Sequence, residues 1–260
     1  MTSNLSAYFS KLGYRVLAVD GDLYLPKLAF HFGIDNPAYN IHTLLKNPEM
    51  RTTDAIYHDQ KTGVDVLPGS PSIYDILDVD PKRMRAVVRE ILPRYNFTVV
   101  DSPVGIPFDT ISTFVLASHQ LIIIEIGRSP IHSTYRMIEN EILKLQALGE
   151  AYGLQVGVMI NKVRESGQRL NDLVDFIEYS IDIPVLGVVP FDYKVPEASN
   201  HGIPVVAYDP RAKASKAIAS TGDRMLEWIL GRRKEGTLEK IYKRIMSLFG
   251  RKRIPAGKKF

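Results

Sequence analysis

The chain has 260 residues, of which 45% are hydrophobic and 24% are charged, as in an ordinary globular protein. It contains no cysteine, which excludes disulfides, iron–sulfur clusters and thiolate metal sites. No apolar run approaches the ~18 residues that span a bilayer, and the N-terminus lacks the pattern of a signal peptide. We therefore expect a cytoplasmic protein.

The formal net charge of +4 is unevenly distributed along the chain. Residues 231–260 hold eleven Lys or Arg against two Glu, whereas the other 22 basic and 27 acidic residues make 1–230 net negative. The pI near 9.1 therefore comes from the tail. We expect one domain at 1–230, without a nucleic-acid footprint of its own, and a separate basic tail at 231–260.

Helical and strand patterns alternate along 1–230 with short connections. This alternation predicts an α/β fold with a doubly wound, mostly parallel sheet flanked by helices. A first helix places Leu5, Phe9 and Leu12 on one face and ends at Gly13. Further helices are predicted at about 81–92 and 131–148. The predicted strands are a segment within 15–22, then 64–67, 97–100, 121–126, 155–160 and 185–189.

Four of these strands end in polar residues, which would meet on the rim where open α/β sheets bind ligands. A carboxylate after an apolar strand is costly unless it has a partner or a metal. Two strands that end in Asp therefore fit an Mg²⁺–phosphate site, with one Asp near the metal and another orienting a water. The strand ends are Asp20 with Asp22, Asp101 with Ser102, Asn161 with Lys162, and Pro190-Phe191-Asp192.

Two plainer interpretations of these strand ends stay open. Asp20 and Asp22 could form a solvated acidic turn, with Gly21 allowing the backbone to bend. Asp101 or Ser102 could cap the next helix. Both alternatives become less favourable when all four strand ends are considered together.

Five segments, in the right order, resemble the MinD/ParA family of P-loop ATPases with the deviant Walker A motif. In that family a KGGVGKTT loop precedes a helix of the form NL…L…G and a strand ending VLLIDxD. Here Asn4-Leu5, Leu12-Gly13 and VLAVDGD keep that order and spacing. YNFTVVDSPVGI at 95–106 resembles the Walker B and switch II segment. VMINKVRE at 158–165 resembles the segment with the adenine-recognising Asn, and residues 183–206 resemble the closing strand and base loop.

The resemblance implies ATP and Mg²⁺ as cofactors and suggests roles on the phosphate side. Asp22 would orient the attacking water. Asp20 and Asp101 would hold the Mg²⁺ shell through water, and Asp20 would thereby contact the nucleotide site. Gly105 would bring a backbone N–H to the γ-phosphate, as switch glycines do.

On the base side, the resemblance assigns four residues. Asn161 would form a hydrogen bond with the adenine edge. Pro190, Phe191 and Asp192 would line the base pocket. These roles come from the resemblance alone.

One family element is missing from the sequence, which contains no G-x-x-x-x-G-K-[ST] and no KGG segment. In register with the family, Met1 falls directly after GKTT, so the phosphate loop and the first strand would lie upstream. In the family, we expect that strand to pair between the strands ending at Asp20 and Asp101. The chain as written should bind ATP weakly and hydrolyse it negligibly. Either the natural start lies upstream, or the protein is a pseudo-ATPase.

Residues 237–250, TLEKIYKRIMSLFG, predict an amphipathic helix in the tail. Such a basic helix suits the interface of an anionic membrane, and it resembles the membrane-targeting helix of MinD-like family members. Alternatively, the helix packs on the domain or on another helix, or the tail binds DNA, although DNA has no need of an apolar stripe. The residues expected at the membrane are Leu238, Ile241, Lys243, Arg244, Ile245, Leu248 and Phe249.

The resemblance implies an ATPase that couples ATP binding and hydrolysis to reversible membrane association, in cell division or intracellular positioning. An ATP-bound homodimer would present two tails to the inner face of the cell membrane and bind more tightly than one tail. A regulatory protein is a candidate partner. The alternatives are a ParA-type DNA-partitioning ATPase and a non-enzymatic pseudo-ATPase scaffold.

Overall fold

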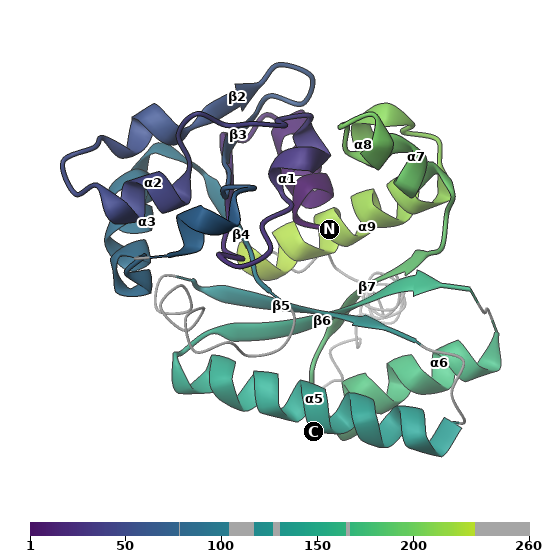
Figure 1. Ribbon diagram of the computed structural model, residues 1–260. Coiled ribbons are helices and arrows are strands. Elements are labelled where there is room, and N and C mark those ends of the chain that lie inside the picture. The colour runs from purple at the N-terminus through teal and green to yellow at the C-terminus, as the bar shows by residue number, and fades with distance from the viewer. Residues whose placement is uncertain (78, 104–116, 127–130, 165–166, 232–260) are drawn as a thin grey trace, which may run out of the picture. The chain divides into compact units, whose positions relative to one another are not determined.

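The computed structural model describes residues 1–77, 79–103, 117–126, 131–164 and 167–231. The described strands form a four-stranded sheet in the order β2-β3-β1-β4 and a three-stranded sheet in the order β5-β6-β7 (Figure 1). Neighbouring strands are parallel except β2 and β3. The strands are β1 (Val16–Asp20), β2 (Tyr57–Asp59), β3 (Val64–Leu67), β4 (Phe97–Asp101), β5 (His119–Glu125), β6 (Gln155–Val163) and β7 (Val185–Pro190).

Helices connect these strands and cover their faces. The α-helices are α1 (Thr2–Lys11), α2 (Ile41–Lys46), α3 (Met84–Ile91), α5 (Ile131–Ala151), α6 (Gln168–Asp175), α7 (Lys194–Asn200), α8 (Val205–Tyr208) and α9 (Lys213–Ile229). Short 3₁₀ turns are η1 (Ala29–Phe32), η2 (Thr52–Ala55), η3 (Ile73–Ile76), η4 (Pro81–Arg83) and η5 (Leu92–Arg94), and η7 (Phe176–Ser180) is a π-helical turn. The expected α/β class with mostly parallel strands is confirmed.

One expectation about the sheet is wrong. From the family resemblance, we expected the family's first strand to pair between the strands that end at Asp20 and Asp101. In the structure, β1 and β4 pair directly in parallel. Their register runs from Val16 opposite Phe97 to Asp20 opposite Asp101. Apolar runs in the sequence identify strands but carry no information about which strands become neighbours. The pairing of β1 with β4 could therefore not be predicted from the hydrophobic pattern.

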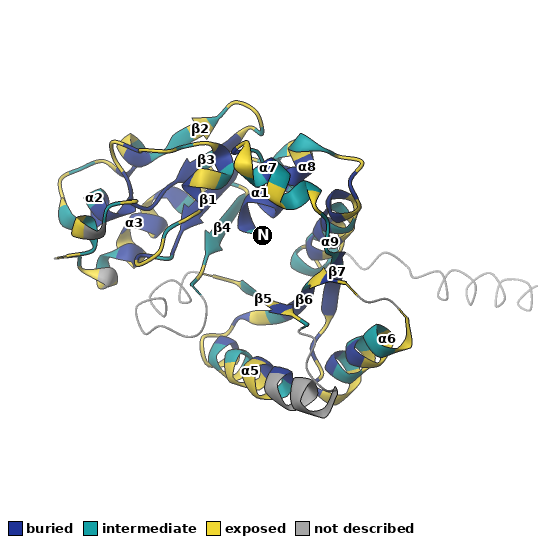
Figure 2. Cartoon of the chain, turned by 45° about the vertical axis from the view of Figure 1, so that its right-hand side comes forward, coloured by how far each residue is buried: buried dark blue, intermediate teal, exposed yellow. Residues whose placement is uncertain are grey.

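The core of the four-stranded sheet is built around β1, whose residues are all buried (Figure 2). Because side chains alternate along a strand, Leu17 and Val19 face α2 and α3 and share one apolar cluster with them. Helix α1 covers the opposite face (Figure 1). Its Phe9 stacks on Phe97 of β4 with ring centroids 4.9 Å apart. The sheet is thus covered on both faces, as parallel sheets require.

The three-stranded sheet has its own apolar core. Ile122 and Ile124 of β5 and Val158 and Ile160 of β6 join a cluster with α5 and α6. On β7, Gly187 lies against α9, because a Cβ added there would meet the hydroxyl oxygen of Thr221 at 1.9 Å. Each of the two sheets therefore has its own apolar core.

The turn after helix α7 meets the loop that follows β1 through a close backbone approach at a pair of glycines. Gly33 and Gly202 both have positive φ, at 69° and 59°. A Cβ added to Gly202 would lie 2.5 Å from Cα of Gly33, so no larger residue fits there. Ser199 Oγ lies 3.0 Å from Nδ1 of His31 in η1 and adds a polar contact beside this glycine pair.

The chain divides into two compact units, Met1–Gly222 and Asp223–Phe260. The boundary at 230/231 expected from the sequence stays a prediction, since the tail beyond residue 231 lies outside the described residues. Among the helices that the structure describes, none combines the length and apolarity needed to cross a membrane.

Packing of α1 on β4 leads to a first prediction. Phe9 is 1% exposed, so Phe9→Ala should lower the free energy of unfolding by about 3–5 kcal/mol through loss of aromatic contacts and formation of a cavity. Leu12→Ala on the same helix is the matched control, because Leu12 is 45% exposed and should change stability by about 0.5 kcal/mol or less. Urea denaturation measures both. Equal losses would contradict the described packing.

Candidate functional site

Asp20, the last residue of β1, is completely buried. Its Oδ2 accepts the N–H of Leu28 at 2.9 Å, and its Oδ1 accepts the N–H of Asp22 at 3.2 Å. Burial raises the pKa of this carboxyl group to about 7, the nearby Asp101 carboxylate raises it further, and the Leu28 N–H opposes the rise. Asp20 is therefore a buried acid poised to change its charge near neutral pH.

Asp101 stands opposite Asp20 at the end of β4. The backbone brings the two strand ends together, since the N–H of Gly21 donates to the carbonyl oxygen of Asp101 at 2.8 Å. A Cβ at Gly21 would lie 2.5 Å from that oxygen, so a larger residue would force the strand ends apart. Thr2 at the start of α1 donates its hydroxyl to Oδ1 of Asp101 at 2.5 Å. Two carboxylates and one hydroxyl thus gather at one edge of the sheet.

This donor set fits Mg²⁺. Carboxylate and hydroxyl oxygens are hard donors, and a cation here would offset the repulsion between Asp20 and Asp101 that contributes to the raised pKa of Asp20. Within the described residues there is no group of three or more His, Cys, Asp or Glu suited to hold a metal. Mg²⁺ in proteins keeps several waters and usually binds one or two carboxylates plus substrate phosphate, which matches the carboxylates of Asp20 and Asp101.

Asp22 orders the loop after β1. Its Oδ1 accepts the N–H groups of Tyr24 and Leu25 at 3.2 and 2.9 Å, which makes a local side-chain turn. The alternative interpretation of an acidic turn therefore fits Asp22. It does not describe Asp20, whose carboxylate lies inside the protein.

Asn161 belongs to the second group of candidate residues, on β6, where it lies opposite Glu125 of β5. The next residue, Lys162, has a φ of 54°, which is unfavourable for a residue with a Cβ, and its Nζ pairs with Glu125 at 2.7 Å. Strained backbone of this kind concentrates at functional sites. No sequence pattern signalled this conformation.

A hollow of about 430 Å³ lies beside Pro190 and Phe191. Phe191 is attached to β6 through its N–H, which donates to the carbonyl oxygen of Val163 at 2.8 Å. The guanidinium carbon of Arg164 lies 3.5 Å from the centre of the Phe191 ring, a cation–π contact. Its size lies within the range of small-molecule sites. The lining residues are Val163, Arg164, Leu170, Val188, Pro190, Phe191 and Lys213.

The Asp192 carboxylate accepts hydrogen bonds from backbone N–H groups and is not among the residues that line this hollow. It accepts the N–H of Lys194 at 3.0 Å and that of Ala214 at 3.1 Å. These hydrogen bonds, chiefly that from Lys194, lower the pKa of Asp192. Asp192 thereby joins the end of β7 to the start of α9, and its role toward a base stays a prediction.

The structure brings Asp20, Asp22 and Asp101 into one group. It places Asn161 on β6 and Pro190 at the end of the neighbouring strand β7, with Phe191 directly after it. Sequence reasoning missed three residues at these places, Thr2, Arg164 and Lys213. Thr2 could have been noticed in the sequence, because it lies in the first turn of a predicted helix. The positions of Arg164 and Lys213 beside the hollow depend on packing and could not. Gly105 and the seven predicted membrane residues of the tail lie outside the described residues.

A parallel α/β fold with a buried Asp20 beside the partly buried Asp101 at one sheet edge, and a hollow beside β7, defines a nucleotide-binding class of protein. Residues 1–205 match the model of the CobQ/CobB/MinD/ParA nucleotide binding domain. The chain therefore belongs to this family, and the MinD/ParA resemblance is confirmed.

Among its relatives is an uncharacterized ATP-binding protein of Methanocaldococcus jannaschii, 26% identical over 97% of this chain and 92% of the relative. The cell division ATPase MinD of Pyrococcus furiosus superposes with a TM-score of 0.73 at 29% identity, covering 87% of this chain and 92% of that one. The septum site-determining protein MinD of Pyrococcus horikoshii, solved with Mg-ADP, has a TM-score of 0.75 at 26% identity, covering 90% and 92%.

The raised pKa of Asp20 leads to a prediction about pH. The folded state holds the Asp20 proton up to about pH 7, while the unfolded state releases it near 3.8. Stability from this group is therefore complete at low pH and is lost as the pH rises through about 7. Asp20→Asn should show a smaller fall in unfolding free energy between about pH 5 and about pH 8 than the wild type does. The exposed Asp35→Asn is the control. Equal pH slopes for wild type and Asp20→Asn would contradict the assignment.

Proposed function

We propose that this protein is a MinD-like ATPase that couples ATP binding and hydrolysis, through homodimerisation, to reversible membrane association in cell division or intracellular positioning. The observation that carries the proposal is the pairing of Asp20 and Asp101 at adjacent strand ends, with the Thr2 hydroxyl on Asp101. The family membership and the likeness to a cell division ATPase and to a MinD solved with Mg-ADP support it.

On the phosphate side, Asp20 and Asp101 hold Mg²⁺ through water, and the ion when bound neutralises phosphate charge. Asp22 orients the attacking water. Its carboxylate is suited to this task because the N–H groups of Tyr24 and Leu25 fix its orientation through Oδ1. Fixed orientation matters because a positioned base need not reorganise at the moment of reaction.

On the base side, Asn161 binds the adenine edge, and Pro190 and Phe191 line the base pocket. Support comes from the hollow beside these two residues and from the strained backbone directly after Asn161. Arg164 covers the Phe191 ring, so an entering base displaces it or stacks beside it. The Asp192 carboxylate contributes by anchoring this loop to α9.

The tail carries the proposed link to the membrane. The apolar stripe of residues 237–250 inserts into the headgroup region, while Lys243 and Arg244 face anionic lipid. The protein would then sit at the inner face of the cell membrane when ATP-bound. One short helix binds weakly, so pairing two tails in a dimer makes attachment depend on nucleotide.

The catalytic part of the proposal is tested on ATP hydrolysis. The 260-residue chain is expected to turn over ATP negligibly, and the reading frame extended upstream of Met1 to hydrolyse it with Mg²⁺. In the extended chain, Asp22→Asn should lower kcat about 100-fold or more while nucleotide affinity changes little. Asp35→Asn, an exposed aspartate, is the matched control. An upstream sequence without a phosphate-binding loop would contradict the ATPase proposal and favour the pseudo-ATPase scaffold. Full activity in Asp22→Asn would contradict the role proposed for Asp22.

Membrane attachment is tested by flotation of the protein with anionic liposomes. Ile245→Glu and Phe249→Glu should abolish flotation, because a charge on the apolar stripe opposes insertion. Lys234→Glu, in the basic tail before residues 237–250, changes charge without altering the apolar stripe, and should weaken binding only in part. Binding that survives both stripe variants but disappears at high salt would point to a purely electrostatic contact, as expected for DNA.

A further inference from the structure

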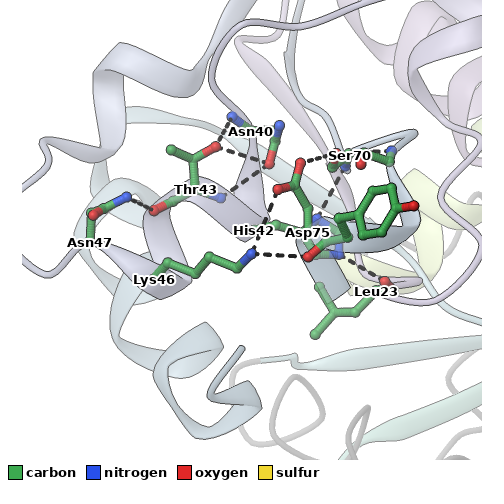
Figure 3. A network of polar contacts seen from close by, with 10 residues as sticks. Leu23, Asn40, His42, Thr43, Lys46, Asn47, Ser70 and Asp75 are labelled. Carbon is green, nitrogen blue, oxygen red and sulfur yellow. Dashed lines mark hydrogen bonds and ion pairs between the residues drawn. The ribbon is translucent and has the colours of Figure 1, made fainter. Parts of the chain in front are cut away.

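His42 is a fully buried histidine in the first turn of α2. The helix begins after Asn40, whose side chain accepts the N–H of Thr43 at 3.1 Å in a capping box (Figure 3). His42 Nε2 lies 2.7 Å from the carbonyl oxygen of Leu23. On its other side, the N–H of Ser70 donates to His42 Nδ1 at 3.1 Å. One imidazole ring therefore bridges two loops.

These two contacts fix the state of the ring. A backbone N–H can only donate, so Nδ1 carries no proton, and a carbonyl oxygen can only accept, so Nε2 carries one. The ring is neutral in this arrangement. Burial lowers the pKa of His42, and the charged groups that act on it are Asp75 of η3, which raises the pKa, and Lys46 of α2, which lowers it.

The two bridged loops lie beside the carboxylates of Asp20 and Asp22. Leu23 directly follows Asp22 in the loop after β1. Ser70 directly follows Gly69 in the loop after β3, where a Cβ added to Gly69 would lie 3.5 Å from Cγ of Asp20. The same Cβ would lie 2.2 Å from Cβ of Pro26, so the two loops are in direct contact.

Ser70 is held from its other side as well. Its hydroxyl donates to Oδ2 of Asp75 at 2.5 Å and accepts the N–H of Ser72 at 3.1 Å. Lys46 pairs with the other oxygen of Asp75 at 3.6 Å (Figure 3). The N–H of Ile41 donates to the carbonyl oxygen of Pro68 at 2.9 Å, a further tie between α2 and this loop. Because Ser70 is fixed by these contacts, the His42 ring that it binds is fixed too, and the ring in turn holds the carbonyl group of Leu23 in place.

We propose that His42 is a positioning residue, which in its neutral form bridges the loops after β1 and β3 and thereby sets the carboxylates of Asp20 and Asp22. The bridge itself is independent of ligand. Only the consequence for Mg²⁺-nucleotide rests on the proposed function.

Protonation would break the bridge on one side. An imidazolium ring donates from both nitrogens, so the Ser70 N–H would face a second donor and lose its acceptor. The loop after β1 should then loosen in acid, below the ordinary pKa of histidine, because burial favours the neutral ring. The amides that report this are those of Tyr24, Leu25 and Leu28, which donate to Asp22 and Asp20.

The test is amide hydrogen exchange by NMR in the full 260-residue chain without nucleotide. His42→Leu removes both ring contacts and should reduce protection of the Leu25, Leu28 and Ser70 amides about tenfold or more. His42→Gln offers one donor and one acceptor that do not titrate, so it should restore most of that protection. It should also abolish the acid loss of protection that the wild type shows. His58→Leu, which removes an exposed histidine of β2 that is hydrogen-bonded to Asp65 of β3, is the matched control and should leave these amides unchanged.

The proposal is overturned if His42→Leu leaves these amides protected, if His42→Gln fails like His42→Leu, or if the wild type and His42→Gln have the same pH profile. Should His42→Leu unfold the whole chain, seen as lost protection of Val158 in β6, the comparison of wild type with His42→Gln decides. If the chain extended upstream of Met1 binds no Mg²⁺-nucleotide while the exchange results are as expected, the proposed function is contradicted and the positioning role of His42 stands.

Discussion

The rest of the structure depends on the close approach of two carboxylates at the ends of β1 and β4. Strand pairing places Asp20 beside Asp101, and the hydrogen bond from the Gly21 N–H to the carbonyl oxygen of Asp101 holds the two strand ends together. Bringing two like charges together in a buried place is unfavourable. The protein offsets this cost with backbone N–H groups on Asp20, with a hydroxyl on Asp101 and with a pKa that lets Asp20 be neutral.

The groups proposed for chemistry also serve as hydrogen-bond acceptors for the backbone. Asp20 and Asp22 together order the loop after β1, and Asp192 ties β7 to α9. Replacing any of them changes local structure as well as charge. Loss of activity in such a variant therefore does not by itself identify a catalytic role, and the placement of nearby amides has to be measured beside it.

Much of the fold could be predicted from the sequence, because buried strands such as 64–67 consist of apolar runs that end in turn residues. The polar strand ends that form the site also follow from the pattern. The pairing of β1 with β4 and the division of strands between two sheets did not, since partner choice depends on packing between distant segments. The bridge formed by His42 was equally inaccessible, because a histidine in a short helix carries no sequence signal of what its ring contacts.

The contact between Gly33 and Gly202 has a mechanical consequence. A side-chain contact can slide or change rotamer, but two backbones at this separation allow neither adjustment. The loop after β1 and the turn after helix α7 are therefore mechanically coupled, because a displacement of one backbone has to move the other.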